Sequence, residues 1–340
     1  MLPLSRRATG PVHRILRDVD PAKAIDPLVG PAPDDAQWQA LRRRAVRWSI
    51  GVAAVLALTK LVASLMSGSV SLLASLADSM ADVAASSLAL WSVSVAHRPA
   101  DEEHRFGHGK AEALSSLVQA AFVGTSGVFV LYTGIARLLD PRPVEQTTLA
   151  IAVMVVSMFG SGLVVAIQAR VLRQVRSIAI EADSLHYRGD LLANASVIVA
   201  IVLADHGGQT WADPVVGAAI AGYLFWSALG IVRGSIDLLM DRELSDEARA
   251  RIEAIVEQDP DAEGVHDLRT RSLGQAAHVE LHLELDGHMD LYRAHTITDR
   301  IGRAIVAAFP GSEVTIHTDP AGLPEDRLDD RIAEAEAEGG

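Results

Sequence analysis

The chain has 340 residues, of which 49% are hydrophobic and 21% are charged, and its mean hydropathy is +0.23. So much apolar side chain excludes a disordered protein. The formal net charge of -13 argues against a nucleic-acid binder, which needs a basic surface. The absence of cysteine excludes disulfides, iron–sulfur clusters and thiolate zinc sites, so histidine and carboxylate must hold any metal.

The first stretch of the chain, residues 1–40, is polar, rich in proline and aspartate, and without hydrophobic periodicity. We expect a flexible cytoplasmic extension there. No signal peptide is expected, because no apolar run follows Met1 closely.

Residues 41–241 are predicted to form an all-α transmembrane domain of six helices. About 20 apolar residues cross a bilayer core. Six segments of sufficient length carry few charges: Trp48–Met66, Ser69–Ala96, Leu114–Leu139, Leu149–Ile167, Ile178–Ala204 and Pro214–Val232. The alternative is the large helical core of a soluble protein, which six such segments joined by short loops disfavour.

Loop charges predict the orientation, because cytoplasmic loops carry an excess of lysine and arginine. Basic residues gather before the first span and in the loops after the second and fourth spans. By contrast, residues 140–148 contain one basic residue, Arg142, and residues 205–213 contain no lysine or arginine. Both termini are therefore expected in the cytoplasm.

Residues 242–322 are predicted to form a small soluble α+β domain. Ser245 is expected to cap its first helix, because the serine oxygen can accept a helix N–H and two acids follow it. The expected order is helix, strand, strand, helix, strand, over residues 245–258, 265–271, 278–285, 291–309 and 313–318. Residues 323–340 are predicted to be a disordered acidic tail.

Ionisable residues lie inside two predicted spans, where a charge at the bilayer centre costs roughly 2.5–3.5 kcal/mol. Asp78 and Asp82 are four residues apart in the second span and share one helix face. His186 and Asp190 have the same spacing in the fifth span. Two such helices side by side offer three carboxylates and one imidazole, a tetrahedral set that suits Zn²⁺.

Other interpretations of these charges stay open. Asp183 is a competing ligand, which we expect nearer the cytoplasmic end and outside the metal's direct ligands. The acids could also line a wet crevice, or pair with Arg188 or Lys60.

The loop after the second span contains a further set of potential ligands, Asp101, His104 and His108. They could ligate a second ion, with Gly107 and Gly109 letting the loop bend around it. The alternative is a solvated polar loop.

The soluble domain contains a third set. His282 lies on the polar face of its strand, and His317 and Asp319 are two apart, hence on one face of theirs. His266 falls on the first strand and His295 on the second helix. Together these residues could hold another metal, although a single exposed histidine usually has no such role.

Three motifs carry a resemblance to a known family: Asp78-Ser-Met-Ala-Asp82, His104-Arg-Phe-Gly-His-Gly-Lys-Ala-Glu112 and Asp183-Ser-Leu-His-Tyr-Arg-Gly-Asp190. Together they resemble the cation diffusion facilitator family. The stretches 266–271 and 316–320 are similar to its bacterial ferrous-iron and zinc efflux branch. The resemblance implies a homodimeric antiporter of divalent metal and protons, with a metallochaperone-like (ferredoxin-like) cytoplasmic domain.

The family motifs also imply which residues bind metal. The matching positions of the transport site are Asp78, Asp82, His186 and Asp190. Those of the loop site are Asp101, His104 and His108. Those of the site in the cytoplasmic domain are His266, His282, His295, His317 and Asp319.

The predicted function is export of Zn²⁺, with Cd²⁺, Fe²⁺ or Co²⁺ as alternatives, by alternating access in exchange for protons. Zn²⁺ is also expected as a structural or regulatory ion in the cytoplasmic domain. His186 is the expected proton carrier, since imidazole titrates near neutrality and metal ligands must lose protons.

Two rival functions are possible for such a sequence. A metal-sensing membrane receptor would need no polar residues through the spans. An intramembrane metalloenzyme would need an open metal position with a general base, and the sequence has no HExxH motif. We therefore predict a protein that is not an enzyme and has no nucleic-acid partner.

Overall fold

The computed structural model describes residues 35–67, 70–139, 148–207, 212–274, 276–324 and 326–339. Most of the predicted N-terminal extension thus lies outside the described residues. The described chain divides into two compact units, one of residues 35–97 and 111–236 and the other of residues 98–110 and 237–339. The loop that follows the second predicted span therefore belongs to the same unit as the C-terminal domain.

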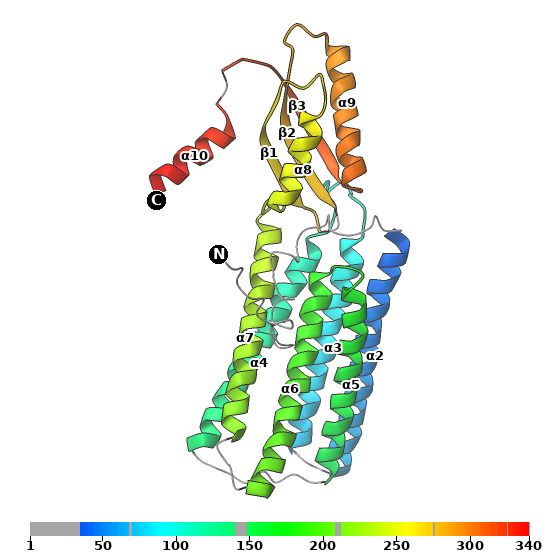
Figure 1. Cartoon of the computed structure of the whole chain (residues 1–340). Helices are drawn as coiled ribbons and strands as arrows, with labels where there is room; N and C mark the ends of the chain where they lie inside the picture. Colours follow the sequence, from blue (N-terminus) through cyan, green and yellow to red (C-terminus); the bar gives the residue numbers. More distant parts are fainter. Residues whose placement is uncertain are drawn as a thin grey trace, which may run out of the picture. The chain divides into compact units, whose positions relative to one another are not determined.

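The first unit is a bundle of long helices (Figure 1). They are α2 (Asp35–Ser67), α3 (Val70–Ala96), α4 (Ala111–Leu139), α5 (Thr148–Leu172), α6 (Ile178–Gly207) and α7 (Ala212–Leu239). Among the residues that the structure describes, each of these helices except α6 contains a stretch long and apolar enough to cross a membrane. The N-terminal half of α6 carries charged residues, among them Glu181, Asp183 and Asp190. The count of six spans therefore stays a prediction.

Small buried side chains let the helices of the bundle pack closely. Ala45, Ala89 and Ala179 are buried in a core shared by α2, α3, α5 and α6. A second core joins α4, α6 and α7, where a Cβ added at Gly189 would lie 3.2 Å from Cδ2 of Leu224. Because α3 also contacts α6, polar side chains from these two helices can meet inside the bundle.

Large apolar side chains cover much of the outside of the bundle. Exposed examples on its helices are Trp48, Leu65, Phe129, Phe159 and Trp226. A soluble protein rarely exposes so many large apolar side chains. This surface fits the hydrocarbon region of a bilayer.

The second unit contains the predicted order of helix, strand, strand, helix and strand. Its elements are α8 (Asp246–Glu257), β1 (Gly264–Ser272), β2 (Ala277–Leu285), α9 (Leu291–Ala308) and β3 (Glu313–Pro320). Ser245 caps α8 as predicted, because its side chain accepts the N–H of Ala248. Asp290 caps α9 in the same way through the N–H of Arg293.

The three strands form one sheet in the order β1-β2-β3, in which β1 and β2 are antiparallel and β2 and β3 are parallel. The apolar face of β2, with Val279, Leu281 and Leu283, is buried in one core with Ile252 of α8 and Ile301 of α9. A ferredoxin-like unit has four strands, whereas the sheet of the described residues has three. The ferredoxin-like assignment therefore stays a prediction.

Where the sequence analysis expects a disordered acidic tail, the structure has helix α10 (Leu328–Gly339). The segment is rich in alanine and glutamate, which favour helix. The carboxylate of Asp267 on β1 also accepts the N–H groups of Leu328 and Asp329. These contacts satisfy donors that a helix start otherwise leaves unpaired, so tertiary contacts help α10 to form.

Candidate metal-binding sites

The membrane bundle brings together Asp82 of α3 with His186 and Asp190 of α6, whose ligand atoms all lie within 4.8 Å of one another. Nε2 of His186 lies 2.6 Å from Oδ1 of Asp82 and 3.8 Å from Oδ2 of Asp190. Asp82 and His186 are buried, at 4% and 8% exposure. Two carboxylates and an imidazole, with Asp190 partly exposed, form a set of ligands suited to a divalent cation.

Asp78, the fourth predicted ligand, lies one turn before Asp82 on α3 and is exposed. It is not one of the three residues that converge. Lys60, proposed as an alternative partner of these acids, donates instead to Oγ of Ser79 at 2.6 Å and to the carbonyl of Ser75 at 3.1 Å. The bundle thus assembles three of the four predicted transport ligands.

Asp183, which is predicted to lie outside the direct ligands, belongs to a separate buried network. Its carboxylate accepts hydrogen bonds from Oγ of Ser86 at 2.8 Å and from Nε2 of Gln168 at 2.6 Å. Gln168 also donates to Ser49, and the hydroxyl of Tyr187 lies 2.9 Å from that of Ser86. These side chains come from α2, α3, α5 and α6, so the network ties four helices together beside the converging ligands.

The loop between α3 and α4 brings together Asp101, His104 and His108. Oδ1 of Asp101 accepts the backbone N–H of His104 at 2.6 Å, and Oδ2 lies 3.3 Å from Nε2 of His108. The backbone N–H of His104 lowers the pKa of the Asp101 carboxyl, helped by the two imidazoles. The carboxylate is therefore held in the ionised form that a metal needs.

The two glycines of this loop have different roles. Gly107 has φ +78°, in the left-handed region that favours glycine, and bends the loop as predicted. At Gly109 an added Cβ would lie 1.7 Å from the carbonyl oxygen of Leu273, in the β1–β2 turn. Gly109 is thus needed for close packing of the loop on the sheet, a role the sequence analysis did not foresee.

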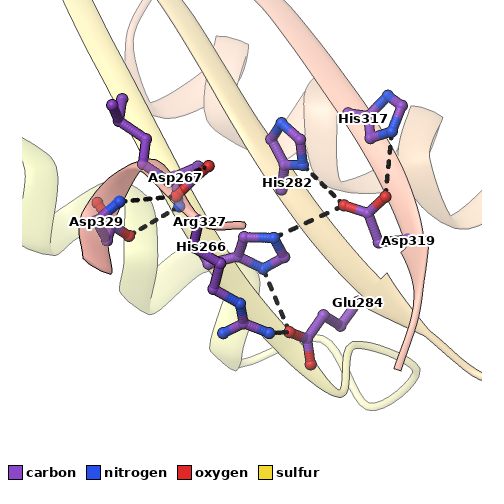
Figure 2. Close-up of polar contacts among 9 residues, drawn as sticks. His266, Asp267, His282, Glu284, His317, Asp319, Arg327 and Asp329 are labelled. Atoms are coloured by element: carbon purple, nitrogen blue, oxygen red, sulfur yellow. Dashed lines mark hydrogen bonds and ion pairs between the residues drawn. The ribbon is translucent and has the colours of Figure 1, made fainter. Parts of the chain in front are cut away.

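The sheet of the second unit carries the third cluster, His266 of β1, His282 of β2 and Asp319 of β3 (Figure 2). The register places His266 opposite His282 and His282 opposite His317, so three histidines form a row across the strands, and Asp319 lies two residues beyond His317 on β3. Oδ2 of Asp319 lies 2.7 Å from Nδ1 of His282 and 3.7 Å from Nε2 of His266. The arrangement offers two nitrogens and a carboxylate to one cation.

The other two histidines predicted for this site differ in position. His317 is exposed, and its Nε2 lies 3.1 Å from Oδ1 of Asp319, so it borders the cluster. His295 lies exposed on α9 and is not one of the three converging residues.

Sequence reasoning missed two residues beside this cluster, Glu284 and Arg327. Oε1 of Glu284 lies 3.3 Å from Nδ1 of His266, and the guanidinium of Arg327 pairs with the same carboxylate. The alternation of β2 places Glu284 on the face of His282, a usable signal. No sequence pattern places Arg327 there, because its position depends on how the tail folds back.

Apolar helices around buried histidine and aspartate, with more ligand clusters in a soluble domain, define a membrane transport protein for metal cations. Two family models match the chain: the cation efflux transmembrane domain over residues 46–240 and the cation efflux protein cytoplasmic domain over residues 244–321. The chain belongs to the cation diffusion facilitator family, also called the cation efflux family.

Similar proteins include the cation-efflux pump FieF of Shewanella oneidensis, 45% identical over 83% of this chain and 94% of that protein. FieF of Serratia proteamaculans is 40% identical over 86% of this chain and 98% of that protein. Among solved structures, the metal-bound C-terminal domain of the CzcD transporter from Thermotoga maritima is 31% identical. The match covers 23% of this chain and 93% of that structure, with a TM-score of 0.23.

Proposed function

We propose that this cation efflux protein exports Zn²⁺ from the bacterial cytoplasm across the inner membrane in exchange for protons, with Fe²⁺, Cd²⁺ or Co²⁺ as further cargo. The observation that carries the proposal is the convergence of Asp82, His186 and Asp190 inside the helix bundle. Asp78, one turn along α3, completes the four-ligand set in this proposal. The FieF relatives are named as cation-efflux pumps, which supports export as the direction.

The contact between His186 and Asp82 supports coupling of metal to protons. A hydrogen bond of 2.6 Å between an imidazole nitrogen and a carboxylate needs one proton between them. Ligand atoms around a tetrahedral Zn²⁺ lie about 3.3 Å apart, given metal–ligand bonds of about 2 Å. Metal binding must therefore separate the two groups and release that proton.

Alternating access completes the cycle. In the inward-open form the ligands give up protons and bind the cytoplasmic ion, and in the outward-open form they take up protons and release it. The Asp183 network is placed to hold α2, α3, α5 and α6 together as one body while other helices move. All six helices span the membrane in this proposal, with both termini in the cytoplasm, as the loop charges favour.

The cytoplasmic domain, proposed to bind Zn²⁺ at His266, His282 and Asp319, also contributes to a homodimer, which the match to the family's cytoplasmic dimer domain supports. A receptor without transport is the less favoured alternative. It would give no reason for buried charged ligands among apolar helices, where each charge costs several kcal/mol.

The test is zinc accumulation by inverted membrane vesicles that contain the protein. Asp82→Ala and Asp190→Ala each remove a ligand, and we expect a loss of uptake of at least tenfold without loss of folded protein. Asp299→Ala, which changes an exposed carboxylate on α9, is the control and should leave uptake unchanged. Near-normal uptake by either membrane variant would refute the site.

A further inference from the structure

The C-terminal extension lies beyond the residues matched by the family's cytoplasmic domain, which end at 321. It turns back onto the sheet and is fastened there by reciprocal hydrogen bonds (Figure 2). The carboxylate of Asp267 accepts the N–H groups of Leu328 at 2.9 Å and Asp329 at 3.0 Å. In return, the carboxylate of Asp329 accepts the N–H of Asp267 at 2.9 Å.

An unusual backbone conformation on β1 makes this attachment possible. Asp267 has φ +50°, a left-handed conformation that costs energy for a residue other than glycine. It lies at the shift in β1–β2 register between His266 and Arg269. The bulge turns the Asp267 side chain toward the start of α10, while the adjacent His266 stays in the metal-binding row.

The residues that attach α10 to the sheet lie beside the candidate metal cluster. Arg327, next to the first residue of α10, pairs with Glu284, whose Oε1 lies 3.3 Å from Nδ1 of His266. The other nitrogen of His266, Nε2, is the one that lies toward Asp319, at 3.7 Å. The imidazole therefore has a carboxylate on one side and the proposed metal ligands on the other. Metal-bound histidines usually have such a carboxylate, which fixes ring orientation and tautomer.

We propose that Glu284 and Arg327 are positioning residues for the cytoplasmic metal site and that they couple docking of the C-terminal helix to metal binding. Arg327 holds the Glu284 carboxylate, Glu284 accepts a hydrogen bond from Nδ1–H of His266, and Nε2 is thereby presented to the ion. This inference rests on the proposed function, in which His266, His282 and Asp319 bind metal. Because coupling is reciprocal, metal binding also strengthens docking of the tail.

An exposed ion pair alone would not carry this inference, because such pairs contribute little. Here the Glu284 side chain is only 16% exposed and that of Arg327 34%. Both are held next to a histidine whose side chain is 5% exposed. In the opposite mechanism, the Arg327 cation repels the metal, and removal of Arg327 would tighten metal binding. The direction in which the metal affinity changes therefore decides between positioning and repulsion.

The first experiment measures Zn²⁺ affinity of the full-length protein in detergent by competition with a chelating dye. Asp82→Ala and Asp101→Ala in the background remove the other two candidate sites. In that background we expect Arg327→Ala to weaken zinc binding about tenfold, the usual cost of losing an outer partner of a ligand. Arg327→Lys, which keeps the charge, should retain part of the affinity. Arg331→Ala, which changes an exposed arginine on α10, should leave the zinc affinity unchanged.

The second experiment measures hydrogen exchange at the amides of Leu328 and Asp329, a readout independent of transport. Zn²⁺ should slow their exchange in the background protein and should not do so after Asp319→Ala. If Arg327→Ala binds Zn²⁺ as tightly as its parent, or more tightly, while Asp319→Ala binds weakly, the coupling is overturned and the metal site stands. If Asp319→Ala binds as tightly as its parent, the proposed site itself fails, and the coupling fails with it.

Discussion

His186 is the single nitrogen ligand in the converging membrane cluster, where Asp82 and Asp190 provide oxygen. Imidazole favours Zn²⁺, whereas carboxylates favour harder ions such as Mn²⁺. The identity of this one side chain therefore bears on two properties at once, the choice of metal and the release of a proton.

We expect His186→Asp to weaken the preference for Zn²⁺ over Mn²⁺ and to change the pH profile of transport. The nitrogen ligand becomes oxygen, and a side chain with an ordinary pKa of about 6.5 is replaced by one with an ordinary pKa of about 3.9. The measurement compares Zn²⁺ and Mn²⁺ flux between pH 6 and 8.

His186→Glu serves as a companion variant with a longer side chain, in case aspartate does not reach the ion. An unchanged metal ranking together with an unchanged pH profile would mean that His186 is neither ligand nor proton carrier.

At the scale of elements, the cytoplasmic unit is held by a polar clamp between α9 and the segment after α8. Nε and Nη2 of Arg300 donate to the two carboxylate oxygens of Asp259, and Arg300 also donates to Asp261 at 2.7 Å. The hydrogen bonds from Arg300 hold the pKa of Asp259 below its ordinary value, with help from the N–H of Asp261 and against the effect of burial. Because the pKa is lower in the folded state, the ionised carboxylate stabilises the fold.

Asp259→Asn should lower the free energy of unfolding of a fragment of residues 242–340 by about 1 kcal/mol at pH 7. This stabilisation is present above the unfolded-state pKa of about 3.9 and is lost as the pH falls through the folded-state value. The difference between wild type and variant should therefore shrink progressively below about pH 4. Denaturant unfolding at several pH values measures it.

Asp299→Asn changes an exposed carboxylate that pairs with Arg303 on the same helix and should cost less at pH 7. An equal cost for the two variants, or a difference for Asp259→Asn that is as large at pH 3 as at pH 7, would contradict the clamp.

The elements best predicted from sequence are those with a strong local signal. Ser245 marked the start of α8, and the alternation over 278–285 marked β2, because a cap and a half-buried strand each leave a local pattern. Asp82, His186 and Asp190 were found because an ionisable residue is rare in an apolar span.

Features that depend on tertiary contacts left no such pattern. The hydrogen bonds of Gln168 to Ser49 and Asp183 join helices far apart in sequence. The left-handed Asp267 and the α10 helix that it caps depend on each other. The sequence alone therefore predicts candidate ligands, but not the residues that hold them in position.

At the scale of the whole molecule, the chain combines an apolar helix bundle with a ligand-bearing soluble unit, and the family assignment covers both. In the proposed function, the bundle provides the path of the ion, because its helices surround Asp82, His186 and Asp190. In the proposed coupling, metal binding to the second unit strengthens docking of α10, which lies beyond the family domain. Metal is proposed to cross the bundle in exchange for protons at Asp82, His186 and Asp190.

The most direct test reconstitutes the purified protein in liposomes that enclose a pH-sensitive dye and a zinc-sensitive dye. On imposing a Zn²⁺ gradient, we predict that zinc flux is accompanied by proton flux in the opposite direction. Both fluxes should require metal, and both should be lost in Asp82→Ala. Zinc flux without proton movement, or equal fluxes in the Asp82→Ala variant, would contradict the account.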